Sequence, residues 1–381
     1  MDEQIVFGQC KKIDPQQINH LWERVNVDLG KRSYDILIGP GILLETPNFI
    51  KQLGSFSKIF LVTDTNVEDY IGQDLLNLFY GENDLTGVEL ISFPAGEESK
   101  NIDTVISLAR RMVQKGADRS SLILALGGGV VGDIAGFLAS IYMRGIPFVQ
   151  LPTTLLAQVD SSVGGKTGVD LPEGKNLIGT FAQPIGVLAD IGVLTTLPAS
   201  EIKNGISEIV KYGMIKDKKL FEKLEESWWD VINLEPQLTS YLVRRSCEIK
   251  AEVVSKDEKE GGYRRILNFG HTIGHAIEAA SNYTIPHGEA VAMGMVAVSK
   301  ISANRGLLED QDVERLIELL KRFDLPTAIP DEISHEKVLE NIKRDKKAKA
   351  GKVHFVLAKG IGDTLITDDV SDKEVLEAIT S

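Results

Sequence analysis

The sequence predicts an α/β N-terminal domain, Rossmann-like with a mainly parallel sheet, followed by a mostly α-helical C-terminal domain. Over residues 23–197, short apolar and β-branched runs alternate with helical stretches, which is typical of βαβ units. From residue 198 onward the pattern changes to long amphipathic helices. Residues 1–22 are polar and lack sustained periodicity. We therefore expect an N-terminal extension (1–22), an α/β domain (23–197) and a helical domain (198–381).

Each predicted element has its own signal in the sequence. The strands of the α/β domain are predicted from the runs ERVNVDL, SYDILIG, KIFLVTD, GVELISFP, SLILALGGG, FVQLPTT and GVLADI. Helical periodicity in the second half is clear in SEIVKYGMI, SYLVRRSCEIKAEVVSKDE and VERLIELLKRF. Near the C-terminus, KVHFVLAKG and DTLITDD predict a late pair of short strands.

Size and composition exclude several classes of function. The chain has 381 residues, enough for two domains, and a net charge of −13. Phosphate backbones are bound through surplus Lys and Arg, so nucleic acid is not an expected partner. The longest apolar stretches, such as VAMGMVAV, are far short of the roughly 20 residues of a membrane helix, so no membrane is expected. Two cysteines and the lack of a signal-peptide pattern at the start predict a cytoplasmic protein.

A glycine-rich turn follows the predicted strand SLILAL. The run GGGVVGD, from Gly127 to Asp133, satisfies G-x-G-x-x-G at a strand-to-helix turn, where backbone N–H groups can bind a pyrophosphate. The usual acidic residue about 20 positions on is missing, but Asp64 and Asn66 end an earlier strand where such sheets bind ligands. A nucleotide site and a plain tight turn beside a solvated carboxylate remain equally open. VGGKT is no standard P-loop, because Asp160 occupies the place of its first glycine.

Three of the six histidines fall within seventeen residues. His271 and His275 share one face of a predicted helix, and His287 opens the next apolar helix. The zinc motif H-E-x-x-H is absent, because Thr272 follows the first histidine. Any one of these histidines fits a helix cap or a packed core, but the three together predict a metal site. Glu208 is the natural carboxylate to complete it, although an ordinary ion pair on its own helix is the alternative.

Several basic residues lie beside glycines or inside apolar sequence, which is unusual in an acidic chain. A buried ammonium without a partner is costly, so such groups usually meet an anion. Any single lysine can instead extend its stem to solvent. Together the basic residues indicate a small, multiply charged substrate such as a phosphorylated acid. They are Arg144, Lys166, Lys175, Lys211, Lys250 and Arg264.

Longer motifs resemble a known family. The run GGGVVGDIAGFLASIYMRGIPFVQLPTTLLAQVDSSVGGKTGVDLPEGKNLIGTFAQP, then ISEIVKYGMI, and then LNFGHTIGHAIE with HGEAVAMGM strongly resemble 3-dehydroquinate synthases of the shikimate pathway. The resemblance covers about residues 23–365. It implies a homodimer that uses NAD and one divalent metal ion, zinc or cobalt. The implied reaction converts 3-deoxy-D-arabino-heptulosonate 7-phosphate (DAHP) to 3-dehydroquinate and phosphate, on the route to chorismate and the aromatic amino acids.

The same resemblance implies roles for substrate and metal residues. The implied metal ligands are Glu208, His271 and His287. Residues implied at the phosphate are His275, Lys166, Asn176 and Arg144, the last reaching across from the other subunit, with Lys346 or Lys347 near the C-terminus. Residues implied around the substrate carboxylate and ring hydroxyls are Lys250, Arg264 and Asn268, with Lys175 and Lys211 completing the pocket.

The resemblance also implies the cofactor residues. Asp160 is implied to lie between the substrate and the nicotinamide. The implied NAD residues are Asp64, Asn66, Glu97, Lys100, Gly128, Gly129, Asp133, Thr153, Thr154, Thr196 and Leu197, with Lys166 and Lys175 beside them.

Three other functions stay open at the level of sequence. One is a sister sugar-phosphate cyclase that makes a valiolone-type or inosose-type ring. Another is a metal-dependent polyol dehydrogenase on a related fold, which would release NADH. The third is a non-catalytic relative that binds NAD or a phosphosugar, an idea weakened because every implied ligand is intact.

Overall fold

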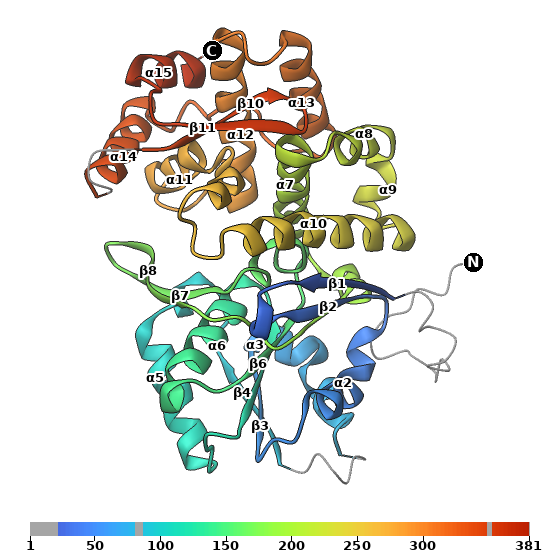
Figure 1. Ribbon diagram of the computed structural model, residues 1–381. Helices are drawn as coiled ribbons and strands as arrows, with labels where there is room; N and C mark the ends of the chain where they lie inside the picture. Colours follow the sequence, from blue (N-terminus) through green and yellow to red (C-terminus); the bar gives the residue numbers. More distant parts are fainter. Residues whose placement is uncertain (1–21, 81–86, 349–352, 381) are drawn as a thin grey trace. The chain divides into compact units, whose positions relative to one another are not determined.

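The computed structural model describes residues 22–80, 87–348 and 353–380, which form two compact units (Figure 1). The first unit contains the described chain up to Leu197 together with Thr239–Ser255. The second contains Pro198–Leu238 and the described chain from Lys256 onward. The predicted helical domain had included Thr239–Ser255, which the structure assigns to the first unit. Of the predicted N-terminal extension, all but Trp22 lies outside the described residues.

A seven-stranded sheet forms the centre of the first unit. Its strands in spatial order are β1 (Glu23–Val27), β2 (Tyr34–Gly39), β9 (Val187–Asp190), β6 (Phe148–Pro152), β5 (Leu122–Gly127), β3 (Ile59–Asp64) and β4 (Val88–Phe93). β1 and β2 pair antiparallel, and the other neighbours pair in parallel. The strands coincide with the runs named from sequence, and the predicted Rossmann-like α/β domain is confirmed.

Helices cover both faces of this sheet, and side chains alternate between two cores. Phe60 and Val62 of β3 pack in a core with α5 and α6, whereas Ile59 and Leu61 pack in a second core with α2 and α4. Figure 1 shows α5 and α6 on one side of the strands and α2 on the other. Strands covered on both faces are apolar throughout, which explains the run SLILAL. The helices are α2 (Thr46–Leu53), α4 (Gln73–Asn77), α5 (Ile102–Gln114) and α6 (Gly129–Ile141).

The first unit also contains a hairpin that the sequence analysis did not predict. It pairs β7 (Lys166–Leu171) with β8 (Gly174–Phe181) in antiparallel fashion. Glycine, proline and charged residues interrupt its apolar alternation, which is the usual strand signal. The remaining elements of this unit are α3 (Thr65–Val67), most of α10 (Pro236–Lys256), π-helical segments at Glu68–Gly72 and Ala157–Ser161, and 3-10 segments at Gly30–Arg32, Ile42–Glu45, Glu97–Ser99, Tyr142–Arg144 and Ile191–Thr196.

The second unit is built mainly of helices, as predicted. They are α7 (Ala199–Lys216), α8 (Lys218–Glu226), α9 (Trp228–Ile232), α11 (His271–Ala280), α12 (His287–Asn304), α13 (Asp310–Arg322), α14 (His335–Ala348) and α15 (Asp372–Thr380). A 3-10 segment spans Tyr263–Asn268, and the predicted late strands β10 (Phe355–Gly360) and β11 (Asp363–Thr367) pair antiparallel. Among the described helices, none is long and apolar enough to cross a membrane.

α7 lies in the centre of the second unit. Its residues from Asn204 to Ile215 are all buried. A helix buried on every side is normally apolar on every side, so polar residues within it stand out. Glu208 and Lys211 are such residues, and both must find polar partners because they are withdrawn from water.

Candidate active site

Glycines bring α7, α11 and α12 into close contact. A Cβ on Gly294 of α12 would lie 2.0 Å from the carbonyl oxygen of Gly270, which directly precedes α11. A Cβ on Gly288 would lie 2.5 Å from the Cα of Asn204 in α7. The Gly288 N–H also donates a hydrogen bond of 2.9 Å to the Asn204 side chain. Glu208, one helical turn beyond Asn204, therefore lies beside the start of α12.

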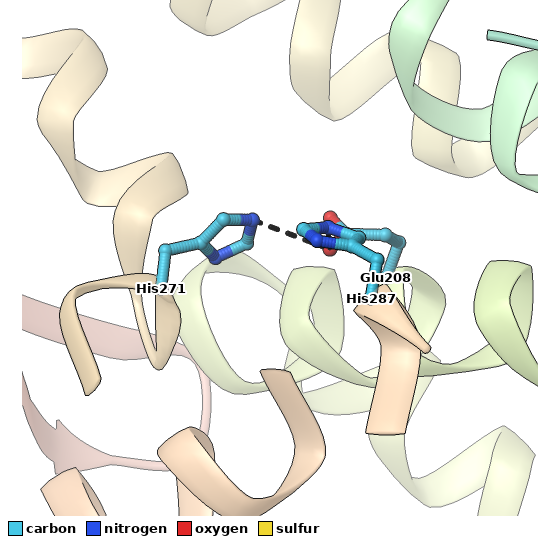
Figure 2. Close-up of side chains that lie close together, drawn as sticks. All are labelled: Glu208, His271 and His287. Atoms are coloured by element: carbon cyan, nitrogen blue, oxygen red, sulfur yellow. Dashed lines mark ion pairs between the residues drawn. The ribbon is translucent and has the colours of Figure 1, made fainter. Parts of the chain in front are cut away.

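Glu208, His271 and His287 converge at this point (Figure 2). The Nε2 atoms of His271 and His287 lie 3.4 Å and 3.6 Å from Oε1 of Glu208. One potential ligand atom from each residue lies within 4.8 Å of the others. The Glu208 side chain is fully buried, whereas the two rings keep some exposure. The structure thus brings together the three residues that the sequence singled out as metal ligands.

An oxygen atom lies within hydrogen-bonding distance of Nδ1 in each of the two rings. Nδ1 of His271 lies 3.1 Å from the carbonyl oxygen of Phe269. Nδ1 of His287 lies 3.4 Å from Oε2 of Glu278, a buried carboxylate on α11. Donation from Nδ1 to these oxygens leaves Nε2 of each ring directed at Glu208. Metal-binding histidines commonly use this arrangement, in which the second nitrogen donates to a carbonyl or a carboxylate.

The electrostatic surroundings of the two histidines differ. Burial and the Lys211 ammonium lower the pKa of His271 to about 3, so its imidazole is neutral at physiological pH. Burial also lowers the pKa of His287, but hydrogen bonds to Glu208 and Glu278 outweigh burial and raise the pKa to about 10. Positive charge at His287 is therefore favourable. A divalent cation bound at Nε2 would supply that charge in place of the proton.

This donor set fits a divalent metal ion. Two imidazole nitrogens and one carboxylate oxygen are a common set for catalytic zinc, which keeps further positions open for water or substrate oxygen. The other oxygen of Glu208, Oε2, accepts a hydrogen bond from the buried Lys211 ammonium. The sequence allowed Glu208 to be a metal ligand or a partner in an ion pair. The two roles are compatible, because Oε2 forms the ion pair while Oε1 faces the histidines.

His275 lies beside Glu208, His271 and His287, which we call the triad. Its ring centroid is 5.3 Å from that of His271 and 6.0 Å from that of His287. Its side chain is exposed, unlike Glu208. An exposed imidazole beside a candidate metal site is well placed to exchange protons with a bound ligand.

The 3-10 segment before α11 carries two predicted substrate residues. Arg264 is only 2% exposed, and its guanidinium donates a hydrogen bond to the carbonyl oxygen of Glu258. Asn268 donates a hydrogen bond of 2.7 Å to Oε1 of Glu260. The Arg264 N–H donates to Oδ2 of Asp257 at 2.9 Å, which fixes the course of this loop. Both predicted residues thus lie within seven positions of His271, on the 3-10 segment that precedes α11.

The glycine turn of the first unit lies where β5 ends and α6 begins. A Cβ on Gly132 would lie 2.9 Å from the Gln150 side chain of β6, so this glycine lets α6 pack against the sheet. That is the role of the third glycine in a dinucleotide-binding turn. A Cβ on Gly128 would lie 3.0 Å from Thr154. Within the described residues no side chain caps α6, whose first turn begins at Gly129, and such uncapped N–H groups suit an anion.

Other predicted nucleotide residues lie at the same sheet edge. β3 and β6 flank β5, so the residues that follow these parallel strands are neighbours. Asp64 accepts a hydrogen bond of 2.9 Å from the Val67 N–H and thereby also caps α3. Thr154 accepts one of 3.1 Å from the Ala157 N–H. Two other predicted residues, Asn66 and Thr153, lie just after strands, while Thr196 ends the 3-10 segment that follows β9 and Leu197 comes directly after it.

Lys100 is the centre of a polar cluster in the first unit. Its Nζ lies 2.7 Å from Oδ2 of Asp133 and 2.7 Å from Oδ1 of Asn176. Burial lowers the pKa of Lys100, but the Asp133 and Glu97 carboxylates outweigh burial and raise it, so the ammonium stays charged. Lys175 lies 3.7 Å from Glu97. The structure thus groups five of the predicted NAD and phosphate residues.

The other basic residues of the first unit lie in different surroundings. Lys250 of α10 is 6% exposed, and its Nζ lies 2.8 Å from Oδ1 of Asp160. Asp160 belongs to a π-helical segment, a distortion that is frequent at functional sites. Lys166 begins β7 and Arg144 ends the 3-10 segment after α6, and both are exposed. The side chains of Lys346 and Lys347 lie outside the described part of the chain.

Glu278 is the residue near the triad that sequence reasoning missed. A usable signal existed, because a glutamate interrupts the apolar run AIEAA seven positions after His271. Residues seven apart share a helix face. That spacing could have identified it as a neighbour of the histidines.

Solved structures define the class to which this fold belongs. A 2-deoxy-scyllo-inosose synthase complexed with carbaglucose-6-phosphate, NAD+ and Co2+ matches with a TM-score of 0.86 and 29% identity, over 94% of this chain and 99% of that one. The 2-epi-5-epi-valiolone synthase of Streptomyces hygroscopicus, with NAD+ and Zn2+ bound, matches with a TM-score of 0.84 and 31% identity. The match covers 91% of this chain and 96% of that one. An iron-containing alcohol dehydrogenase of Thermotoga maritima shares the fold, with a TM-score of 0.65 and 18% identity. The match covers 95% of this chain and 100% of that one. The fold is that of the sugar-phosphate cyclases, and the iron-containing alcohol dehydrogenase has a similar fold.

Sequence comparison narrows this class to one family. The models for the N-terminal and C-terminal parts of 3-dehydroquinate synthase match residues 90–204 and 205–348. The 3-dehydroquinate synthase of Pelobacter propionicus is 46% identical over 346 residues, which cover 90% of this chain and 95% of that protein. That of Caulobacter vibrioides is 46% identical over 361 residues, covering 93% and 97%. The chain belongs to the 3-dehydroquinate synthase family.

Proposed function

We propose that this protein is a 3-dehydroquinate synthase, which converts DAHP to 3-dehydroquinate and phosphate with NAD and one divalent metal ion, zinc or cobalt. The observation that carries the proposal is the convergence of Glu208, His271 and His287 within 4.8 Å in a chain of this family. Solved relatives with NAD+ and Zn2+ or Co2+ support the cofactors. The glycine-rich turn at Gly128 and the polar cluster around Lys100, both in the first unit, also support the binding of NAD.

The reaction needs a temporary oxidation. Phosphate elimination requires an acidic proton beside the carbon that carries the leaving group, and a secondary alcohol does not provide one. A bound metal ion would polarise the hydroxyl, and NAD would supply the oxidant for the hydride of the carbon that carries it, which would make the alcohol a ketone with an acidic neighbouring proton once the hydroxyl proton is lost. After phosphate leaves, the hydride returns, the ring opens and an internal aldol reaction closes the carbocycle. The phosphate group itself can take the proton, so no dedicated enzyme base is required.

Specific side chains serve these steps in our proposal. Glu208, His271 and His287 hold the metal, and His275 relays the proton of the alcohol, a role typically worth about 10² to 10⁴ in rate. Arg264 binds the substrate carboxylate. The residues assigned to the phosphate are Lys166, Asn176, His275 and Arg144, and those assigned to the rest of the substrate are Asp160, Lys175, Lys211, Lys250 and Asn268.

The first unit supplies the NAD site in this proposal. The uncapped start of α6 at Gly129 binds the pyrophosphate through backbone N–H groups, and Asp64 binds a ribose. The Lys100 ammonium stays charged between its two partners and adds positive charge near the phosphates. We further propose a cytoplasmic homodimer in which Arg144 completes the phosphate site of the other subunit.

A sister cyclase activity is the second candidate, because the inosose and valiolone synthases match this fold with TM-scores of 0.86 and 0.84. Their identities of 29% and 31% are well below the 46% shared with 3-dehydroquinate synthases. The higher identity to 3-dehydroquinate synthases favours the formation of 3-dehydroquinate.

The function is tested by incubating the zinc-loaded protein with DAHP and NAD at about one tenth of the DAHP concentration. We expect phosphate to be released in many-fold excess over NAD, with no net NADH at the end, because the hydride returns in each turnover. NADH that accumulates in proportion to product would contradict the proposal and favour a dehydrogenase. Protein that binds NAD but leaves DAHP unchanged would favour a non-catalytic relative.

A further inference from the structure

Glu278 is a buried carboxylate on the face of α11 that carries His271. It follows His271 by seven residues and lies within the apolar run AIEAA. Its exposed fraction is 4%. An ionised carboxylate at such a position costs free energy unless a hydrogen-bonding or charged group meets it. A glutamate placed here therefore needs a specific partner.

The imidazole of His287 is one such partner. Oε2 of Glu278 lies 3.4 Å from Nδ1 of the ring, and Oε1 of Glu208 lies 3.6 Å from Nε2. The ring thus has a buried carboxylate at each nitrogen. Glu208 also lies 3.4 Å from Nε2 of His271, whereas Glu278 approaches His287 at the nitrogen that points away from the triad. The two carboxylates consequently have different positions, one within the triad and one behind it.

We propose that Glu278 is a positioning residue for the metal site: its carboxylate accepts a hydrogen bond from Nδ1–H of His287 and thereby holds Nε2 toward the metal. The inference rests on the proposed metal-binding role of the triad. His287 opens α12 and keeps 30% side-chain exposure, so its ring has room to rotate without such a contact. A fixed tautomer and ring orientation raise the affinity of a histidine for metal, and loss of such a partner typically weakens binding about 10- to 100-fold.

A different use of the same residues is a second ion. Ligand atoms of His275, Glu278 and His287 also lie within 4.8 Å of one another. Two ions would have to share the His287 ring, which would then carry a metal on both nitrogens and have to lose its second proton. The exposed position of His275 makes this set more open than the triad. The hydrogen-bonding role needs no such deprotonation and is favoured.

The proposal is tested by zinc affinity, measured by competition with a chromophoric chelator. Glu278→Leu removes the acceptor and keeps approximately the volume, whereas Glu278→Gln keeps an oxygen that can accept from Nδ1. We expect one zinc ion per subunit in the unmodified protein, about 10- to 100-fold weaker binding in Glu278→Leu, and a smaller loss in Glu278→Gln. Glu318→Gln, at an exposed position of α13, removes the same charge and should leave the affinity unchanged.

A second measurement keeps the test independent of folding defects. Nitrogen NMR of the zinc-loaded, histidine-labelled protein should show His287 protonated at Nδ1 and bound to zinc through Nε2. Thermal unfolding of the zinc-free variants separates loss of fold from loss of affinity, since replacing a buried carboxylate with an apolar side chain need not destabilise the fold.

Four results would overturn the proposal. Unchanged zinc affinity in a folded Glu278→Leu variant would show that the carboxylate does not position the ring, and zinc bound at Nδ1 would show the opposite orientation. Two zinc ions in the unmodified protein, with one lost in Glu278→Leu, would make Glu278 a ligand. If the unmodified protein bound no zinc or cobalt, both this inference and the proposed function would fail.

Discussion

Replacing Glu208 with Gln, or His271 or His287 with Ala, should lower the rate of phosphate release from DAHP by at least about 10³-fold, equivalent to about 4 kcal/mol. Each substitution removes an imidazole or the carboxylate charge from three side chains whose ligand atoms lie within 4.8 Å of one another. Each variant would therefore lose the metal ion that, in our proposal, polarises the hydroxyl to be oxidised. Zinc content after dialysis, measured beside the rate, should fall with each substitution.

His275→Ala is the matched control for this prediction. It removes an imidazole that lies one helical turn from His271 and does not belong to the group of Glu208, His271 and His287. We expect it to retain zinc while losing about 10² to 10⁴ in rate, because proton relay is lost and the ligands remain. Equal loss of zinc in the His275 variant would show that the histidines have been divided wrongly between metal and proton transfer.

Arg264→Ala should lower kcat/KM for DAHP by about 10² to 10³-fold. Arg264 is 2% exposed, and its guanidinium can pair with a carboxylate through two parallel hydrogen bonds. Truncating one partner of a buried charge pair costs about 2 to 5 kcal/mol, because the other charge is left without its partner. The measurement is steady-state phosphate release over a range of DAHP concentrations.

Arg264→Lys separates pairing from charge in this experiment. It keeps the positive charge but loses the planar fork, so we expect most of the activity to be lost as well. Thermal unfolding of both variants is needed as a control, since the guanidinium also donates to the Glu258 carbonyl oxygen. Near-normal kcat/KM in a folded Arg264→Ala variant would remove this residue from the substrate site.

Most of the fold was predictable because its signals are local. Strands buried on both faces, such as β5, are apolar along their whole length. The periodicity of long amphipathic helices predicts the second unit. The hairpin β7–β8 was missed because Gly168 and Gly179 pack backbone against backbone and leave no apolar alternation to detect. The assignment of Thr239–Ser255 to the first unit depends on tertiary packing, which the helical pattern of α10 does not reveal.

The candidate metal site was predictable in outline because its histidines cluster in sequence. Glu208 is distant in the chain, and it stood out as an acidic residue near a lysine in an apolar helix. Glu278 was missed, since its role depends on how α11 and α12 cross at Gly270 and Gly294. The contact of Lys100 with Asp133 and Asn176 likewise joins three segments that are distant in the chain, and no spacing along the chain predicts it.

The most direct test of the central claim compares DAHP with sedoheptulose 7-phosphate, a sugar phosphate of the same chain length. DAHP carries a carboxylate that the other sugar lacks, so a site built to pair that group would leave a buried cation without its partner, and such mismatches discriminate strongly. We predict phosphate release from DAHP and negligible release from sedoheptulose 7-phosphate under the same conditions. Comparable kcat/KM values for the two sugars would contradict the assignment to dehydroquinate synthesis.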